Sequence, residues 1–295
     1  MSLPNDQEIL KRIREIRMEF LRRSTSELQG SYHSAFRGQG MEFSEIRRYF
    51  PGDDVRNISW NTTARNRKLF VKDFKEDRSL NLVLAVDISP SMAFWSKVSR
   101  RVFIAEAGAS LTYSALKVGD KVGALFFDNE IVRFLPPVTR LKNLLVSVGL
   151  TLSLQGKGAA DLVKVEDFLE RSLHETSAIF LFSDFFMDEK QLATSASVLR
   201  RLHVRHQVVP VMVHDPLELD LPHLGILHVR DMESGRAKQL HLSPRLMKKY
   251  RQKMEEHTKL VATLFGRQGM DVLHLKAGDD YVRLFTLYFK RNKKA

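Results

Sequence analysis

The 295-residue sequence contains no cysteine. This absence excludes disulfide bonds, thiolate metal ligands and cysteine nucleophiles, and it is typical of proteins from a reducing compartment. The sequence also lacks an apolar run long enough to span a membrane, and no apolar stretch follows its basic start as in a signal peptide. We therefore expect a cytoplasmic protein without a membrane span.

Motifs of several enzyme and nucleic-acid-binding classes are missing as well. The segment Gly156-Lys157-Gly158 has neither the upstream glycine of a Walker loop nor a following Ser or Thr, so it does not predict a phosphate-binding loop. The ten histidines show no His-Glu-x-x-His spacing, which argues against a zinc protease site. Zinc-finger spacing and the aromatic-rich signature of RNA-binding domains are absent too.

Positive charge is abundant but unevenly placed. The formal net charge is +12, and residues 230–295 hold 16 Lys and Arg against 7 Asp and Glu. Such a balance fits nucleic acid, acidic lipid or an acidic protein partner. Because the excess gathers on one expected helix and on the tail 291–295, we interpret it as a solvated helix face and a basic tail without specific nucleic-acid binding. A basic nucleic-acid-binding protein stays open as a third hypothesis.

The pattern of apolar residues predicts an α/β fold. From Leu80 onward, short apolar runs typical of buried strands alternate with amphipathic stretches typical of helices. Such alternation predicts a mostly parallel central sheet covered by helices on both faces, of the Rossmann type. The expected strands are 80–87, 121–127, 131–135, 178–182, 207–213, 225–230, 237–242 and 271–275, and the expected helices are about 96–118, 139–151, 161–174, 188–201, 244–267 and 280–290.

The first 78 residues have a different character. Residues 1–30 carry apolar side chains at helical spacing and predict one amphipathic helix that ends around Gly30. Residues 31–78 are rich in aromatic residues and interrupted by Gly and Pro, which predicts short strands and turns. We therefore expect an N-terminal helical and irregular extension over 1–78 packed on the main body, an α/β domain over 79–290 and a basic tail over 291–295.

The clearest functional signal follows the first apolar strand. Asp87, Ser89 and Ser91 stand at alternate positions, so their oxygens point the same way from an extended chain. The end of a parallel strand faces the crevice in which open α/β sheets bind ligands, and oxygen ligands suit a hard cation such as Mg²⁺. A polar loop whose serines cap a helix beginning near Trp95 is the alternative interpretation.

Two further loops qualify for the same site, residues 155–161 and Ser183-Asp184. With the triplet they resemble the metal-ion-dependent adhesion site (MIDAS) of von Willebrand factor A domains, in which Asp-x-Ser-x-Ser, a Thr and an Asp hold magnesium. The resemblance implies a weak Mg²⁺ or Mn²⁺ site, because Ala160 stands in place of the Thr. The ligands that this chain would supply are Asp87, Ser89, Ser91, Asp161 and Asp184. An acidic side chain of a protein partner would complete the ligand set.

The segment from Gly40 to Trp60, followed by Ala64-Arg65, resembles the signature of the bacterial family called domain of unknown function 58. This resemblance implies a von Willebrand factor A-like fold and a MoxR-type AAA+ ATPase as partner. The signature residues are Arg47, Pro51, Gly52, Asp53, Asp54, Arg56, Trp60 and Arg65.

The signature also has a structural interpretation of its own. It predicts a turn at Pro51-Gly52 and a helix over 55–64 capped by Asp53 or Asp54. Trp60 would be buried on the inner face of that helix, and the arginines would pair with the carboxylates. The segment is then either an ion-paired clamp on the main body or a partner-binding patch.

The function hypothesis combines these signals. We expect a non-enzymatic interaction module or adaptor that binds a protein partner through the metal site, with Lys157, Phe185 and Phe186 as surrounding contacts. The alternative is a metal-dependent phosphotransfer or hydrolase enzyme that uses Asp87 as nucleophile, helped by Asp184 and Lys157.

Overall fold

The chain divides into two compact units in its computed structural model. One unit comprises Met1–Phe36 with Leu80–Ala295, and the other comprises Arg37–Ser79. The first 36 residues therefore group with the α/β body, whereas we expected residues 1–78 to form one extension. The structure describes residues 6–23, 26–36, 42–55, 58–66, 68–75, 80–93, 96, 99–219, 225–230 and 237–292.

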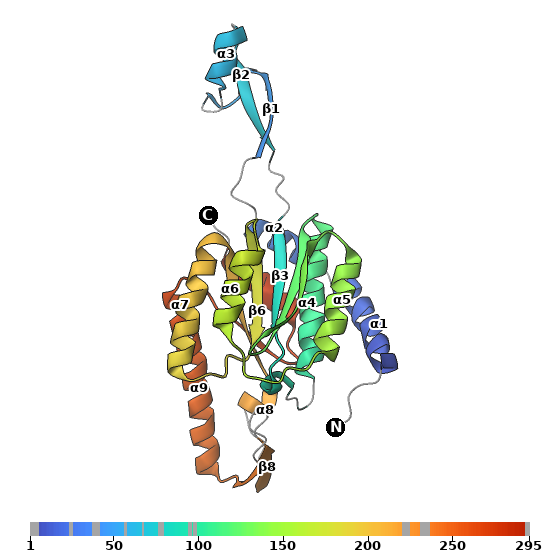
Figure 1. Ribbon diagram of the computed structural model, residues 1–295, viewed down its shortest axis with the longest axis vertical. Coiled ribbons are helices and arrows are strands. Elements are labelled where there is room, and N and C mark those ends of the chain that lie inside the picture. Colours follow the sequence, from blue (N-terminus) through green and yellow to red (C-terminus); the bar gives the residue numbers. More distant parts are fainter. Residues whose placement is uncertain are drawn as a thin grey trace. The chain divides into compact units, whose positions relative to one another are not determined.

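A six-stranded sheet forms the centre of the larger unit, which confirms the predicted α/β fold (Figure 1). Neighbouring strands run parallel except for the antiparallel pair β4 and β5. The sheet order β10-β7-β6-β3-β4-β5 is the arrangement of doubly wound proteins, with a topological switch point between β3 and β6. The strands are β3 (Asn81–Asp87), β4 (Lys121–Phe127), β5 (Ile131–Val138), β6 (Ser177–Ser183), β7 (Gln207–His214) and β10 (Leu273–Lys276).

Strand β3 lies in the interior of the sheet and is buried along its whole length. Leu82 and Leu84 belong to the core on one face of the sheet, whereas Val83 and Ala85 belong to the core on the other. Successive side chains of a strand alternate between faces, so a strand covered on both sides needs a continuous apolar run. The uninterrupted run before Asp87 in the sequence has this physical cause.

Helices cover both faces of the sheet (Figure 1). Helices α4 and α10 pack on the face of Leu82, and α5 packs on α4. Helices α6, α7 and α9 contribute to the core on the face of Val83. Their bounds are α4 (Arg100–Lys117), α5 (Leu141–Ser153), α6 (Leu162–Ser172), α7 (Glu189–Arg205), α9 (Pro244–Arg267) and α10 (Tyr281–Arg291).

The remaining elements of this unit are short. They are the 3-10 helix η2 (Pro90–Ala93), α8 (Pro216–Leu219) and the antiparallel strands β8 (Ile226–Arg230) and β9 (Ala237–His241). Among the described parts of the chain, no helix combines the length and apolar character that crossing a membrane requires.

The N-terminal residues form two helices, α1 (Asp6–Arg23) and α2 (Ser26–Ala35). The prediction of one helix ending at Gly30 is wrong, because that glycine lies inside α2. Ile16 of α1 packs into a cluster with residues of α4 and α5. Tyr32 of α2 is fully buried, and its hydroxyl donates a hydrogen bond to Oδ2 of Asp120 at 2.9 Å. These contacts join the N-terminal helices to the α/β body.

Replacing Tyr32 with phenylalanine should lower the free energy of unfolding by about 1–2 kcal/mol, because the carboxylate of Asp120 loses a buried donor. That carboxylate keeps the backbone N–H of Leu80, which donates at 2.8 Å. Denaturant unfolding of the wild type and Tyr32→Phe measures the difference. Equal free energies would show that this hydrogen bond does not stabilise the anchoring of α2.

The smaller unit contains an antiparallel pair, β1 (Glu42–Arg48) and β2 (Phe70–Lys75), and the helix α3 (Trp60–Asn66). The guanidinium of Arg47 donates two hydrogen bonds of 2.8 Å to Asp53. These bonds are the main reason why the pKa of Asp53 is lowered to about 2. The expected pairing of an arginine with these carboxylates therefore forms between Arg47 and Asp53.

Other details of the signature segment differ from the prediction. Asp53 accepts the backbone N–H of Phe50 at 2.8 Å and closes the turn that holds Pro51 and Gly52, instead of capping a helix. Helix α3 begins at Trp60, later than expected, and the smaller unit does not itself bury this side chain, which is 67% exposed. Asp54 follows the turn, Arg65 lies in the last turn of α3, and Arg56 lies outside the described residues.

Candidate functional site

The candidate site lies at the topological switch point of the sheet. Strand β3 ends at Asp87 and the parallel neighbour β6 ends at Ser183, so their carboxyl ends lie next to each other. Strand β7, which pairs with β6, ends at His214. The carboxyl edge of an open α/β sheet at this point is where ligands bind. The prediction that the triplet and the Ser183-Asp184 loop come together is therefore met by the fold.

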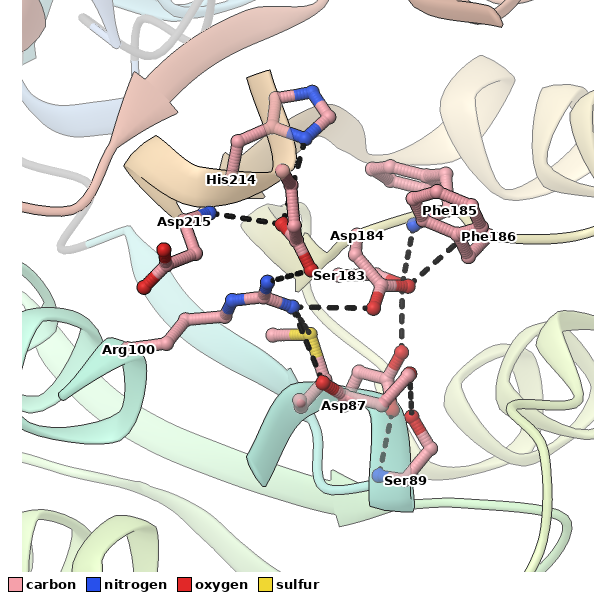
Figure 2. Close-up of polar contacts among 12 residues, drawn as sticks. Asp87, Ser89, Arg100, Ser183, Asp184, Phe185, Phe186, His214 and Asp215 are labelled. Atoms are coloured by element: carbon pink, nitrogen blue, oxygen red, sulfur yellow. Dashed lines mark hydrogen bonds and ion pairs between the residues drawn. The ribbon is translucent and has the colours of Figure 1, made fainter. Parts of the chain in front are cut away.

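Asp87 is buried, with 2% of its surface exposed. Its Oδ2 accepts the hydroxyl of Ser183 at 2.6 Å and its Oδ1 accepts the backbone N–H of Ser89 at 2.8 Å (Figure 2). Burial, followed by the negative charge of Asp184, raises the pKa of Asp87 to about 7 in spite of these donors. The carboxyl that the sequence singles out is therefore enclosed and already hydrogen-bonded.

The serines of the triplet bond to each other. The hydroxyls of Ser89 and Ser91 lie 3.1 Å apart, and Ser91 belongs to the short helix η2. The alternative prediction, that these serines cap the following helix, is wrong. Helix α4 begins at Arg100, and its N-cap is Ser99, whose hydroxyl accepts the backbone N–H of Val102.

A buried arginine lies between two acidic side chains of this site (Figure 2). Arg100 has no exposed surface, and its Nη1 lies 3.2 Å from Oδ2 of Asp184. Its Nη2 forms an ion pair with Oε1 of Glu218, on the short helix α8. The other oxygen of Asp184 accepts the backbone N–H of Phe186 at 3.0 Å. Asp184 is therefore held by a permanent cation, because a guanidinium does not deprotonate in proteins.

The loop 155–161 is organised by a carboxylate that the sequence reasoning did not select. Oδ2 of Asp128 accepts the backbone N–H of Lys157 at 2.7 Å. The backbone N–H of Gly156 donates to the carbonyl of Ile88 at 2.8 Å, and a Cβ at this glycine would lie 2.5 Å from that oxygen. The loop therefore packs directly on the segment that follows Asp87.

In this arrangement Asp161 caps a helix through one carboxylate oxygen, and Ala160 offers no side-chain oxygen. The side chain of Asp161 is the N-cap of α6 and accepts the backbone N–H groups of Val163 and Lys164. Ala160 is half-buried and packs against the core on the face of Val83. The capping role of Asp161 is common for an Asp that precedes a helix.

The predicted partner-binding residues have different surroundings. Phe185 has no exposed surface and packs on Phe265 with a ring-centroid distance of 5.2 Å, so its predicted place on an exposed rim is wrong. Its φ of 52° lies in the left-handed region, which turns the chain and directs the ring inward. Phe186 is 50% exposed and stacks on His257, and Lys157 is exposed.

A divalent metal ion does not fit the residues present. Asp184 is already bound by Arg100, Asp161 caps a helix, and Ala160 has no oxygen in its side chain. In the described part of the chain, no group of three or more His, Asp and Glu side chains has the geometry to hold a metal ion. A second positive charge beside a buried guanidinium would also be repelled.

Sequence reasoning did not select three residues that hold this site together, namely Arg100, Asp128 and, on α8 after β7, Glu218. His214 is the last residue of β7, and burial followed by the charge of Arg100 lowers its pKa to about 4. Burial raises the pKa of Glu218. One signal for Arg100 was present in the sequence, because an arginine in the first turn of a helix opposes the helix dipole and needs acidic partners.

Comparison with known proteins gives one relative matched over nearly the whole chain and one matched over a shorter stretch. The uncharacterized protein Rv1480 of Mycobacterium tuberculosis is 26% identical over 282 residues, which cover 94% of this chain and 88% of that protein. YeaD of Bacillus subtilis, also uncharacterized, is 38% identical over 87 residues, which cover 30% of this chain and 20% of YeaD.

Among solved structures, the chain is similar to BatB from Bacteroides thetaiotaomicron, with 16% identity and a TM-score of 0.47 over 73% of this chain and 100% of that chain. It is also similar to the VWA domain of SpRpn10, with 12% identity and a TM-score of 0.40 over 70% of this chain and 94% of that chain. A family model described as "Protein of unknown function DUF58" matches residues 45–260. This match spans most of the chain, including the signature segment after residue 45 and the whole candidate site, and the chain belongs to the DUF58 family.

Proposed function

We propose that the protein is a non-enzymatic interaction module, an adaptor that binds a protein partner with the loops at the carboxyl edge of β3 and β6. The partner favoured by the family resemblance is a MoxR-type AAA+ ATPase, and the adaptor would serve complex assembly or maturation. Because such a partner works on ATP, the proposal places the complex in the cytoplasm.

The observation that carries the proposal is that hydrogen bonds hold the loops at this edge in place while Phe186 and Lys157, which we call the rim, are exposed. Asp87, Asp128 and Asp184 hold the three loops in place through hydrogen bonds to backbone N–H groups. Above them, Phe186 is 50% exposed and Lys157 is exposed. A rim that is already ordered loses little conformational entropy on binding, and exposed aromatic side chains are frequent hot spots of interfaces.

The two other functions receive less support. An aspartate nucleophile must reach its substrate, but Asp87 is 2% exposed and hydrogen-bonded at both oxygens. The basic residues of α9 occupy exposed positions, opposite the buried Met247 and Met254, as on an ordinary solvated helix face. These residues are Lys248, Lys249, Arg251, Lys253 and Lys259.

The test measures affinity for a purified MoxR-type ATPase from the same organism. Phe186→Ala and Lys157→Glu should each weaken the complex about tenfold or more, because truncating a hot-spot side chain costs about 1.4 kcal/mol or more. Calorimetry or biolayer interferometry gives the dissociation constants, and circular dichroism checks that each variant is folded.

Matched controls lie at the opposite edge of the sheet. Leu141→Ala, at a side chain 39% exposed, and Lys142→Glu change the start of α5. There the amide of Asn143 donates to the carbonyl of Val122, near the start of β4. These controls should bind like the wild type. Equal affinity of all variants would contradict the proposed docking face and move the candidate interface to the segment of Arg47 and Asp53, whereas absence of any complex would contradict the choice of partner.

A further inference from the structure

The buried guanidinium of Arg100 is the feature that the proposed function leaves unexplained. It makes its contacts entirely inside the protein, with Asp184 at 3.2 Å (Figure 2). It also contacts Glu218 and the carbonyl of Ser91, the latter at 3.4 Å. A fully desolvated arginine is unfavourable unless its charge is balanced and its donors are bonded. Two acidic side chains therefore balance the charge of one internal cation.

The position of Arg100 in its helix makes this arrangement more informative. It is the first residue of α4, where the positive end of the helix dipole disfavours a cation. The helix itself offers no compensation there, since its first turn contains no acidic residue. The compensating charges come from the ends of β6 and from the segment after β7, so the cation is held by the carboxyl edge of the sheet and not by its own helix.

The acidic side chains at this edge require a positive charge close to them. Asp87 and Asp184 lie close enough for the charge of Asp184 to raise the pKa of Asp87, and Glu218 lies on the far side of the guanidinium. Without a positive charge among them, two buried carboxyl groups and the partly buried Glu218 would repel one another. A divalent ion and a guanidinium can both supply the positive charge that these carboxyl groups need. Arg100 already contacts Asp184, the residue that matches the last Asp of the MIDAS.

We propose that Arg100 is a built-in counter-cation that takes the place of a divalent metal ion at this site, so that the site keeps its structure without metal. This inference goes beyond the proposed function and does not depend on the identity of the partner. It implies that a partner binds to the rim of the site and not through a metal-bound carboxylate. The magnesium hypothesis from the sequence implies the opposite.

The experiment uses the full chain after treatment with chelator, with Mg²⁺ and Mn²⁺ as probes. Thermal unfolding and calorimetry are followed during titration to millimolar metal, with NaCl of equal ionic strength as the control. The wild type should show no saturable heat and no rise of Tm. A saturable rise of Tm in the wild type that Asp87→Asn removes would overturn the proposal, since a bound ligand stabilises the folded state by mass action.

The Arg100→Ala variant gives the reciprocal result. Removing the guanidinium leaves Asp184 and Glu218 without their ion-pair partner. Arg101, whose charge acts on Asp87, donates to the carbonyls of Leu154 and Ile88 and does not replace it. Mn²⁺ should therefore raise the Tm of the variant in a saturable way. Adding Asp184→Asn to this variant should abolish the rise. If Arg100→Ala folds and does not respond to metal, Arg100 does not occupy the place of a cation and the proposal fails. If this variant does not fold at all, the wild-type calorimetry decides: no saturable Mn²⁺ binding supports the proposal, and saturable binding that depends on Asp87 refutes it.

Discussion

Replacing Arg100 with alanine should lower the free energy of unfolding by about 3–5 kcal/mol in the presence of chelator, because the variant keeps buried acids that have lost their partner. Arg100 has no exposed surface, and both of its acidic partners are largely enclosed, with side chains 4% and 15% exposed. Water cannot replace the lost charge at these positions. Denaturant unfolding at neutral pH measures the effect.

The matched control is an arginine in an ion pair on the surface. Arg171 pairs with Asp167 at 2.6 Å, but the two side chains are 78% and 55% exposed. Arg171→Ala should change the free energy of unfolding by no more than about 1 kcal/mol, as is typical of exposed pairs. Combining Arg100→Ala with Asp184→Asn should recover part of the loss, because one unpaired acid is neutralised. Similar small effects of Arg100→Ala and Arg171→Ala would contradict the view that the internal cation stabilises the edge of the sheet.

The second large effect concerns the protonation of Asp87. At pH values above about 7, Asp87→Asn should raise the free energy of unfolding by up to about 4 kcal/mol, and the gain should disappear near pH 4. The pKa of Asp87 is raised to about 7, chiefly by burial and then by the charge of Asp184. Asparagine has the shape of the protonated acid and does not ionise, so it removes the cost of a buried negative charge.

The sign follows from comparing the folded and unfolded chains. The folded protein keeps the proton of Asp87 up to about pH 7, whereas the unfolded chain loses it near the ordinary pKa of 3.8. The stabilising contribution of the protonated acid is therefore complete below the unfolded pKa and is lost as the pH rises through the folded pKa.

Unfolding of both proteins by denaturant between pH 4 and 8 tests this prediction. Two other groups near the site have shifted pKa values, namely His214, with its pKa lowered to about 4, and Glu218, with its pKa raised. They are present in both proteins, so the difference between wild type and variant at each pH isolates Asp87. A difference that stays constant over this range would mean that Asp87 is ionised throughout and that its charge is balanced.

Much of the fold was predictable because burial leaves a local pattern. The continuous apolar run of β3 reflects cover on both faces of the sheet, and the predicted helix 244–267 coincides with α9. Ser243 precedes Pro244 and caps this helix, so both start signals lie within a few residues of sequence. The N-terminal helices were predicted less well, because the periodicity of apolar residues does not show that one helix ends at Arg23 and another begins at Ser26.

The gathering of Asp87 and Ser183-Asp184 was also predictable, since parallel strands bring their carboxyl ends to one edge of the sheet. The exposure and the hydrogen-bond partners of the side chains around this edge were not predictable. Phe185 points inward because of a left-handed backbone conformation, and Asp161 is occupied by the N–H groups of its own helix. Both outcomes depend on backbone geometry that residue types alone do not reveal.

The sequence by itself determined the sheet, most of its helices and the edge at which the polar loops meet, because these follow from hydrophobic periodicity and from the direction of parallel strands. Only the tertiary structure decided which charge holds that edge together. Arg100 and Asp184 are 84 residues apart in the chain, and their contact requires that α4, β6 and the segment after β7 pack correctly at the same time. Electrostatic balance inside a protein depends on distance and burial in space, and neither is encoded in any local stretch of residues.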